Sequence, residues 1–113
     1  SGRAYTFIAC LYTTSDVAAG VKFAIGGTVT PGSIIYEAQV YQGGVATATT
    51  NQRTTTLGNP VGEVTAVTTA CCIITGTIFV DTGGTLTVQF AQNVDTGTSS
   101  VLVNSSFMLH SIS

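Results

Sequence analysis

The stretch Gly84-Thr85-Leu86-Thr87-Val88-Gln89-Phe90-Ala91-Gln92-Asn93 is the most informative part of this chain. It follows a second strand-like run, Ile73-Ile74-Thr75-Gly76-Thr77-Ile78-Phe79-Val80, and the glycine pair Gly83-Gly84 lies between the two runs. Two strand-like runs joined by a sharp glycine turn predict a β-hairpin in an all-β domain.

The length and composition of the chain limit the number of domains and the classes of function that it can have. Its 113 residues predict one domain, residues 1–113, and only 7% of them are charged, against about 25% in an ordinary soluble domain. A surface so poor in charge limits the solubility of a free monomer, so we expect much of it to be hidden in an assembly. The formal charge of −2 provides no basic patch, which argues against nucleic-acid binding.

Strand-like segments recur along the chain and are separated by glycine and proline turn signals. They predict an all-β fold, an antiparallel β-sandwich that is jelly-roll-like and has about eight strands. The expected strands are residues 5–13, 21–25, 33–41, 45–57, 63–68, 70–80, 85–91 and 101–112.

The first segment, residues 5–13, is apolar on both faces. Tyr5, Phe7, Ala9 and Leu11 share one face, and the other face carries Thr6, Ile8, Cys10 and Tyr12. An apolar residue on each side of a strand predicts burial on both sides.

The chain has three cysteines, which are Cys10, Cys71 and Cys72, and an odd number does not indicate a disulfide framework. Adjacent residues of a strand face opposite sides, so only one of the vicinal pair can face the core. We expect small buried apolar side chains in a chain folded in a reducing cytosol, with a bridge from Cys10 to one of the pair as the alternative. No second cluster supplies the ligands that a metal site needs.

Catalytic chemistry has little basis in this sequence. His110 is the only histidine, and no local motif joins it to a cysteine or a carboxylate. We therefore predict no catalytic residue, no cofactor and no metal. No run approaches 18 apolar residues, so no membrane span is expected, and no signal peptide is recognised.

Five stretches together resemble a β-sandwich domain of tailed-bacteriophage virion proteins, and at fold level they resemble the trimeric jelly rolls of the tumour-necrosis-factor type. The stretches are Gly2-Arg3-Ala4-Tyr5-Thr6-Phe7, Gly20-Val21-Lys22-Phe23-Ala24-Ile25-Gly26-Gly27-Thr28, Gly76-Thr77-Ile78-Phe79-Val80, the opening stretch above and Ser105-Ser106-Phe107-Met108-Leu109. The resemblance implies a non-enzymatic virion component, commonly trimeric, that acts as a capsid decoration (cement) protein or as a trimerising tail fibre or spike domain. It implies a homotrimer, the major capsid protein or other virion proteins as partners, and a location in the virion after assembly in the host cytoplasm.

The nine aromatic rings, four Tyr and five Phe, bear on the subunit interface. A sandwich of this size buries only part of them, and interfaces are enriched in aromatics and depleted of charge. By analogy with the trimeric fold, Phe90, Phe107 and Leu109 are expected to be neighbours across a three-fold axis.

Two functions from other classes compete with the virion protein. One is a stand-alone carbohydrate-binding β-sandwich module that recognises a host-surface glycan, which predicts a monomer with an exposed aromatic flanked by polar groups in a concave site. The other is a small hydrolase that depends on His110.

Overall fold

The computed structural model describes residues 2–15, 20–42, 50–64, 69–92, 97, 99–103 and 105–112. Within these ranges the chain forms nine strands and no helix, which confirms the predicted all-β antiparallel class. The strands are β1 (Arg3–Ser15), β2 (Val21–Gly27), β3 (Thr30–Gln42), β4 (Thr50–Thr54), β5 (Val61–Val64), β6 (Thr69–Thr82), β7 (Leu86–Ala91), β8 (Ser99–Val101) and β9 (Ser106–Ser111).

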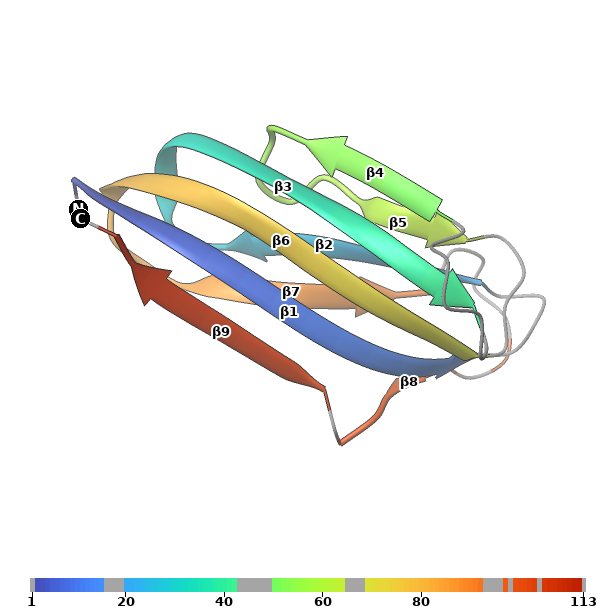
Figure 1. Cartoon of the computed structure of the whole chain (residues 1–113). Coiled ribbons are helices and arrows are strands. Elements are labelled where there is room, and N and C mark those ends of the chain that lie inside the picture. The colour runs from blue at the N-terminus through green and yellow to red at the C-terminus, as the bar shows by residue number, and fades with distance from the viewer. Residues whose placement is uncertain are drawn as a thin grey trace.

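The strands form two antiparallel sheets that lie face to face (Figure 1). The larger sheet has the order β4-β3-β6-β1, and the remaining edge of β1 pairs with β9 and β8. The smaller sheet has only three strands, in the order β5-β2-β7. Six strands on one side and three on the other make a sandwich of unequal layers.

The hydrophobic core lies between the sheets, and the alternation of each strand decides which residues enter it. On β1, Phe7, Ala9 and Leu11 are buried, as the sequence predicts, while Ile8 and Tyr12 point to the opposite face and are exposed. On β6, Cys72, Ile74 and Ile78 face the core in the same way. Other buried members of the core are Val21, Phe23, Ile25, Val29, Ile34, Tyr36, Ala38, Val40, Val61, Val64, Ala70 and Val80.

The predicted hairpin between β6 and β7 is wrong. β6 belongs to the larger sheet, where β1 and β3 occupy its two edges, so it has no free edge for β7. The chain instead crosses to the smaller sheet, where β7 pairs with β2 from Leu86 opposite Gly27 to Ala91 opposite Lys22. Turn residues predicted the sharp change of direction but not the strand that β7 would pair with.

Hydrogen bonds between two connections fix the crossing. The amide of Thr28 donates to the carbonyl oxygen of Thr85 at 3.0 Å, and the amide of Thr85 donates to Thr28 Oγ1 at 2.9 Å. The approach needs glycine, because a Cβ at Gly84 would lie 2.7 Å from Thr28 Oγ1 and Gly27 has φ of 126°. The glycines therefore allow the backbones to meet where the chain changes sheets.

Three other expected strands differ in their bounds. The segment 101–112 is two strands, β8 and β9, which pair with different parts of β1 and account for the ninth strand. Of the segment 45–57, residues 50–54 form β4, and residues 43–49 lie outside the described residues. Of the segment 63–68, the described part ends β5 at Val64, and residues 65–68 lie outside the described residues.

The β4–β5 connection is held against the core by one buried tyrosine. The Tyr36 hydroxyl donates to the carbonyl oxygen of Asn59 at 2.5 Å, and the amide of Gly58 donates to the carbonyl oxygen of Ile25 at 2.8 Å. Burial raises the pKa of Tyr36, so the hydroxyl keeps the proton that it donates. This connection thereby links the two sheets at the β4 and β5 side of the sandwich.

Replacing Gly76 by alanine should destabilise the fold by about 1 to 3 kcal/mol, because the added methyl overpacks a filled site. Gly76 lies in the middle of β6, and a Cβ there would lie 2.6 Å from Tyr36 Cβ and 2.7 Å from Phe7 Cζ. Gly83→Ala is the matched control, since a Cβ at Gly83 meets no atom within 4 Å. Urea unfolding of the two variants measures the difference, and equal stabilities would contradict the packing described here.

Candidate functional site

The larger sheet has an apolar face that the smaller sheet does not cover. Here it is called the outer face, and it is the side of the larger sheet opposite the core. Its residues include Ala4, Thr6, Ile8, Cys10 and Tyr12 of β1, Cys71, Ile73, Thr75, Thr77, Phe79 and Asp81 of β6, Ser33, Ile35, Glu37, Gln39 and Tyr41 of β3, Asn51 and Arg53 of β4, and Ser106, Met108 and His110 of β9.

Large apolar side chains on the outer face are exposed in the single chain. Ile8, Tyr12, Ile35 and Phe79 each expose about two fifths of their surface (41, 40, 40 and 41%), and Met108 exposes 66%. Scattered exposed residues need no explanation, but contiguous apolar patches mark interaction sites. The strand register places Met108 opposite Ile8, whereas Thr75 and Thr77 of β6 separate Ile8 from Ile35. Several exposed apolar side chains thus lie among threonines on one face, which makes the outer face the leading candidate for an interaction surface.

Cross-strand register places the outer-face residues in rows. One row runs from Met108 through Ile8 and Thr75 to Glu37 and Arg53. The next row runs from His110 through Thr6 and Thr77 to Ile35. Neighbours in such rows have Cβ atoms about 4.5 to 5.5 Å apart, so Ile8 is within contact distance of Met108 on one side and of Thr75 on the other.

Charge is sparse on this face. Arg53 Nη2 lies 3.1 Å from Glu37 Oε1, and this cross-strand pair is the one ion pair among the residues that the structure describes. Both side chains are well exposed, so the pair adds little stability. Because the two charges cancel, the pair adds no net charge to the outer face.

A shallow hollow on the outer face lies beside the ion pair of Arg53 and Glu37. Its rim is formed by threonine hydroxyls, one isoleucine and the two charged groups, and Phe79 follows Thr77 on the same face of β6. The outer-face residues that line it are Thr6, Thr75, Thr77, Ile35, Glu37 and Arg53.

The cysteines are arranged as adjacent strand residues require. Cys72 is fully buried in the core, whereas Cys10 and Cys71 are half-buried on the outer face. All three are free, so the alternative of a bridge from Cys10 is not present. Burial raises the pKa of the Cys72 and Cys71 thiols, which keeps both groups in the poorly nucleophilic thiol form.

His110 does not meet a catalytic partner on the outer face. It lies opposite Thr6 on the exposed strand β9, whereas Cys10 lies opposite Ser106. Four residues along a strand separate the two sites by about 13 Å. Among the described residues, no group of three or more His, Cys, Asp or Glu side chains is arranged to hold a metal ion.

The three predicted interface residues lie at one side of the sandwich, where β7 and β9 are the edge strands (Figure 1). The ring of Phe90 packs on Phe23 with centroids 5.5 Å apart, and Phe107 packs on Phe7 at 6.3 Å. Leu109 is about half exposed. Phe90 and Phe107 therefore extend the core, and their place at a three-fold axis stays a prediction.

Sequence reasoning did not single out Met108, Ile35 or Phe79 as surface residues. The signal for the outer face was nevertheless present, because residues 5–13 are apolar on both sides. Only one of those sides is covered within the chain. The predicted burial of both sides is therefore wrong for the single chain, and the uncovered side of this strand is part of the outer face.

Comparisons of the chain with protein-family models, with curated proteins and with solved structures found no match. In the part of the chain that the structure describes, no helix is long and apolar enough to cross a membrane.

Cys72→Ala and Cys71→Ala test which face of β6 meets the core. Removing the buried Cys72 sulfur should lower the free energy of unfolding by about 1 kcal/mol, because it leaves a small cavity. Removing the half-buried Cys71 sulfur should change it by less than about 0.5 kcal/mol. Chemical unfolding of the reduced proteins measures both values, and the reverse order would show that the faces are wrongly assigned.

Proposed function

We propose that this chain is a non-enzymatic structural protein of a tailed-bacteriophage virion and that it assembles as a homotrimer through the outer face. The observation that carries the assembly is the set of exposed apolar side chains on the outer face, which are Ile8, Tyr12, Ile35, Phe79 and Met108. The phage origin is supported by the sequence resemblance. Within the virion, the module serves as a capsid decoration protein or as a trimerising tail fibre or spike domain.

The composition of the outer face supports a protein partner. The buried centre of a protein interface is rich in aromatic residues and Met and poor in Lys, Glu and Asp. The outer face has Tyr12, Phe79 and Met108, and its ion pair lies toward the β4 edge. Burying apolar surface releases about 25 cal/mol for each Å², so coverage of these side chains favours association.

A second apolar surface supports a cyclic assembly over a two-fold dimer. It lies along the β8–β9 side, where Leu102, Val103, Leu109 and Ile112 are exposed by 42, 105, 49 and 55%. A two-fold dimer buries the same patch on both copies, whereas a cyclic trimer joins two different patches and closes. A ring in which the outer face of one copy meets the β8–β9 side of the next covers both surfaces.

The partners and location follow from the same proposal. The trimer binds the major capsid protein or other virion proteins, and it is part of the virion after assembly in the host cytoplasm. Three free cysteines suit folding in that reducing compartment.

A carbohydrate-binding module is the second candidate. The hollow beside Glu37 and Arg53 supports it, because the threonines and the ion pair that line the hollow offer hydrogen-bonding groups. In that case the outer face stays open to solvent and binds a host-surface glycan. The two candidates differ in what covers this face.

Solution mass separates the candidates. Light scattering of the wild-type protein in solution should give a mass near three times the 11.5 kDa of one chain if it is a trimer. Ile8→Glu and Ile35→Glu should lower the mass to that of the monomer, because each places an unpaired charge in a buried interface. Thr87→Glu is the matched control, since Thr87 is an exposed β-branched residue of the smaller sheet, and it should leave the mass unchanged.

Leu109→Glu tests the β8–β9 side of the proposed contact. Loss of the trimer in this variant supports the predicted place of Leu109 at the subunit contact, and an unchanged trimer would contradict it. Leu109 is about half exposed, whereas the rings of Phe90 and Phe107 pack on the core. A monomeric wild-type chain that binds glycan arrays, and loses that binding in Glu37→Gln, would contradict the trimer and favour the carbohydrate-binding module.

A further inference from the structure

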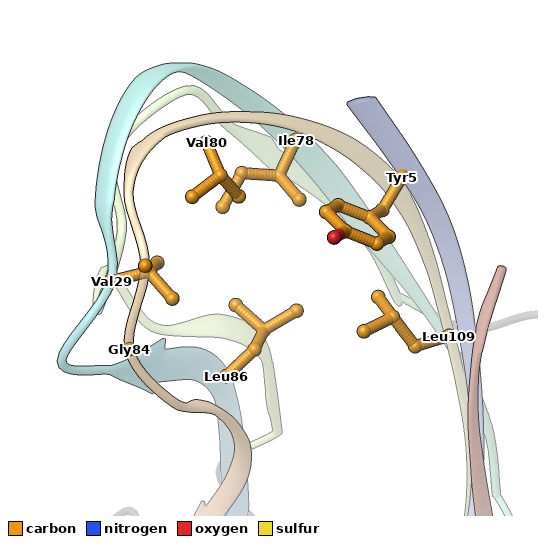
Figure 2. A pocket seen from close by; sticks show the side chains of 8 residues that line it. Tyr5, Val29, Ile78, Val80, Gly84, Leu86 and Leu109 are labelled. Atoms are coloured by element: carbon orange, nitrogen blue, oxygen red, sulfur yellow. The ribbon is translucent and has the colours of Figure 1, made fainter. Parts of the chain in front are cut away.

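A cavity of about 170 Å³ lies between the two sheets, beside the crossing from β6 to β7 (Figure 2). It is called the inter-sheet cavity here. Residues from both sheets and from two connections surround it. The lining residues are Tyr5, Val29, Ile78, Val80, Gly83, Gly84, Leu86 and Leu109.

The unequal layers explain why the cavity is open. Ile78, Val80 and Val29 are buried and form its inner walls. Leu109 belongs to β9 at the margin of the larger sheet, and its side chain points toward the cavity while about half of it remains exposed (Figure 2). Leu86 of the edge strand β7 lines the cavity from the smaller sheet, and half-exposed Leu109 lines it from β9 at the solvent-facing side.

Tyr5 brings the one side-chain hydroxyl of the described lining residues into this cavity. The ring of Tyr5 reaches in from β1, and its hydroxyl points toward the middle of the cavity (Figure 2). Within the part of the chain that the structure describes, that hydroxyl makes no hydrogen bond to the protein. A hydroxyl that faces an apolar cavity gains from a ligand with one hydrogen-bonding atom.

We propose that the inter-sheet cavity binds a compact neutral aromatic molecule with one hydroxyl group, of the phenol class. A cavity of about 150 Å³ lined by apolar side chains accepts benzene, so this one accommodates a six-membered ring with one or two added heavy atoms. Among the described residues no charged side chain lines the cavity, and a charged ligand would lose its hydration without a partner there. The ligand hydroxyl pairs with the Tyr5 hydroxyl, and its ring contacts the valine and leucine side chains. The ligand site does not require the proposed virion role, and Leu109 is the one lining residue that also belongs to the β8–β9 surface of the proposed trimer.

The test uses p-cresol and toluene, which share a ring and a methyl group and differ by one hydroxyl. On methyl-labelled protein, p-cresol at millimolar concentration should shift the methyl signals of Ile78, Val80, Leu86 and Leu109 in a saturable way. The methyl signals of Ile8 and Ile35, on the outer face, should stay in place. Tyr5→Phe should weaken p-cresol binding by about threefold to tenfold and leave toluene binding unchanged.

Neighbouring residues of β9 provide a matched pair of blocking variants. Leu109→Trp fills the mouth and should abolish the p-cresol shifts, whereas Met108→Trp, on the opposite face of the same strand, should retain them. Gly83→Leu is a second blocking variant, because Gly83 lines the cavity and a Cβ there meets no atom within 4 Å.

Three results would overturn the proposal. The first is a wild-type protein whose cavity methyl signals do not shift in a saturable way with p-cresol. The second is equal binding by wild type and by both blocking variants. The third is equal affinity of wild type and Tyr5→Phe for p-cresol, which would remove the hydroxyl-bearing class of ligand.

Discussion

The pairing of β6 with β1 on one edge and with β3 on the other is the constraint on which the rest of the structure depends. Both ladders run along nearly the whole of β6, so its edges are filled and the next strand cannot pair with it. That next strand, β7, pairs with β2 and completes a smaller sheet of three strands. The unequal layers follow directly, and with them the bare outer face and the open side of the inter-sheet cavity.

Local patterns in the sequence predicted the class of fold and the alternation of side chains along β1 correctly, whereas the predicted burial of both faces of β1 is wrong for the single chain. Alternation at Phe7, Ala9 and Leu11 is a local property, and it persists because one side of the strand meets the core. The partner of β7 could not be predicted from local patterns, because it depends on strands that are distant in the sequence. Gly83 and Gly84 permit a sharp turn, but β1 and β3 already occupy both edges of β6. The same reasoning explains why residues 101–112 appeared as one strand although they bind β1 in two places.

The candidate sites were predictable to different degrees. Two apolar sides on residues 5–13 and a charged fraction of 7% indicated that a surface would be hidden, and the structure shows which surface is apolar. The hydroxyl of Tyr5 and the side chain of Leu109 are far apart in the sequence, and only the strand order brings both to one cavity. Phe90 and Phe107 illustrate the opposite case, since rings that composition favoured for an interface pack on Phe23 and Phe7.

The central claim is that another copy of the chain covers the outer face in solution. Paramagnetic relaxation of side-chain methyl groups by a soluble gadolinium chelate tests it most directly, because the effect reports how closely solvent approaches each group. We predict that the chelate has little effect on the relaxation of the methyl groups of Ile8, Ile35 and Met108. In the single chain these side chains are exposed, and Met108 exposes 66% of its surface. The methyl group of exposed Thr87 serves as the reference and should relax fast. Outer-face methyl groups that relax as fast as that of Thr87 would show an uncovered face and contradict the account.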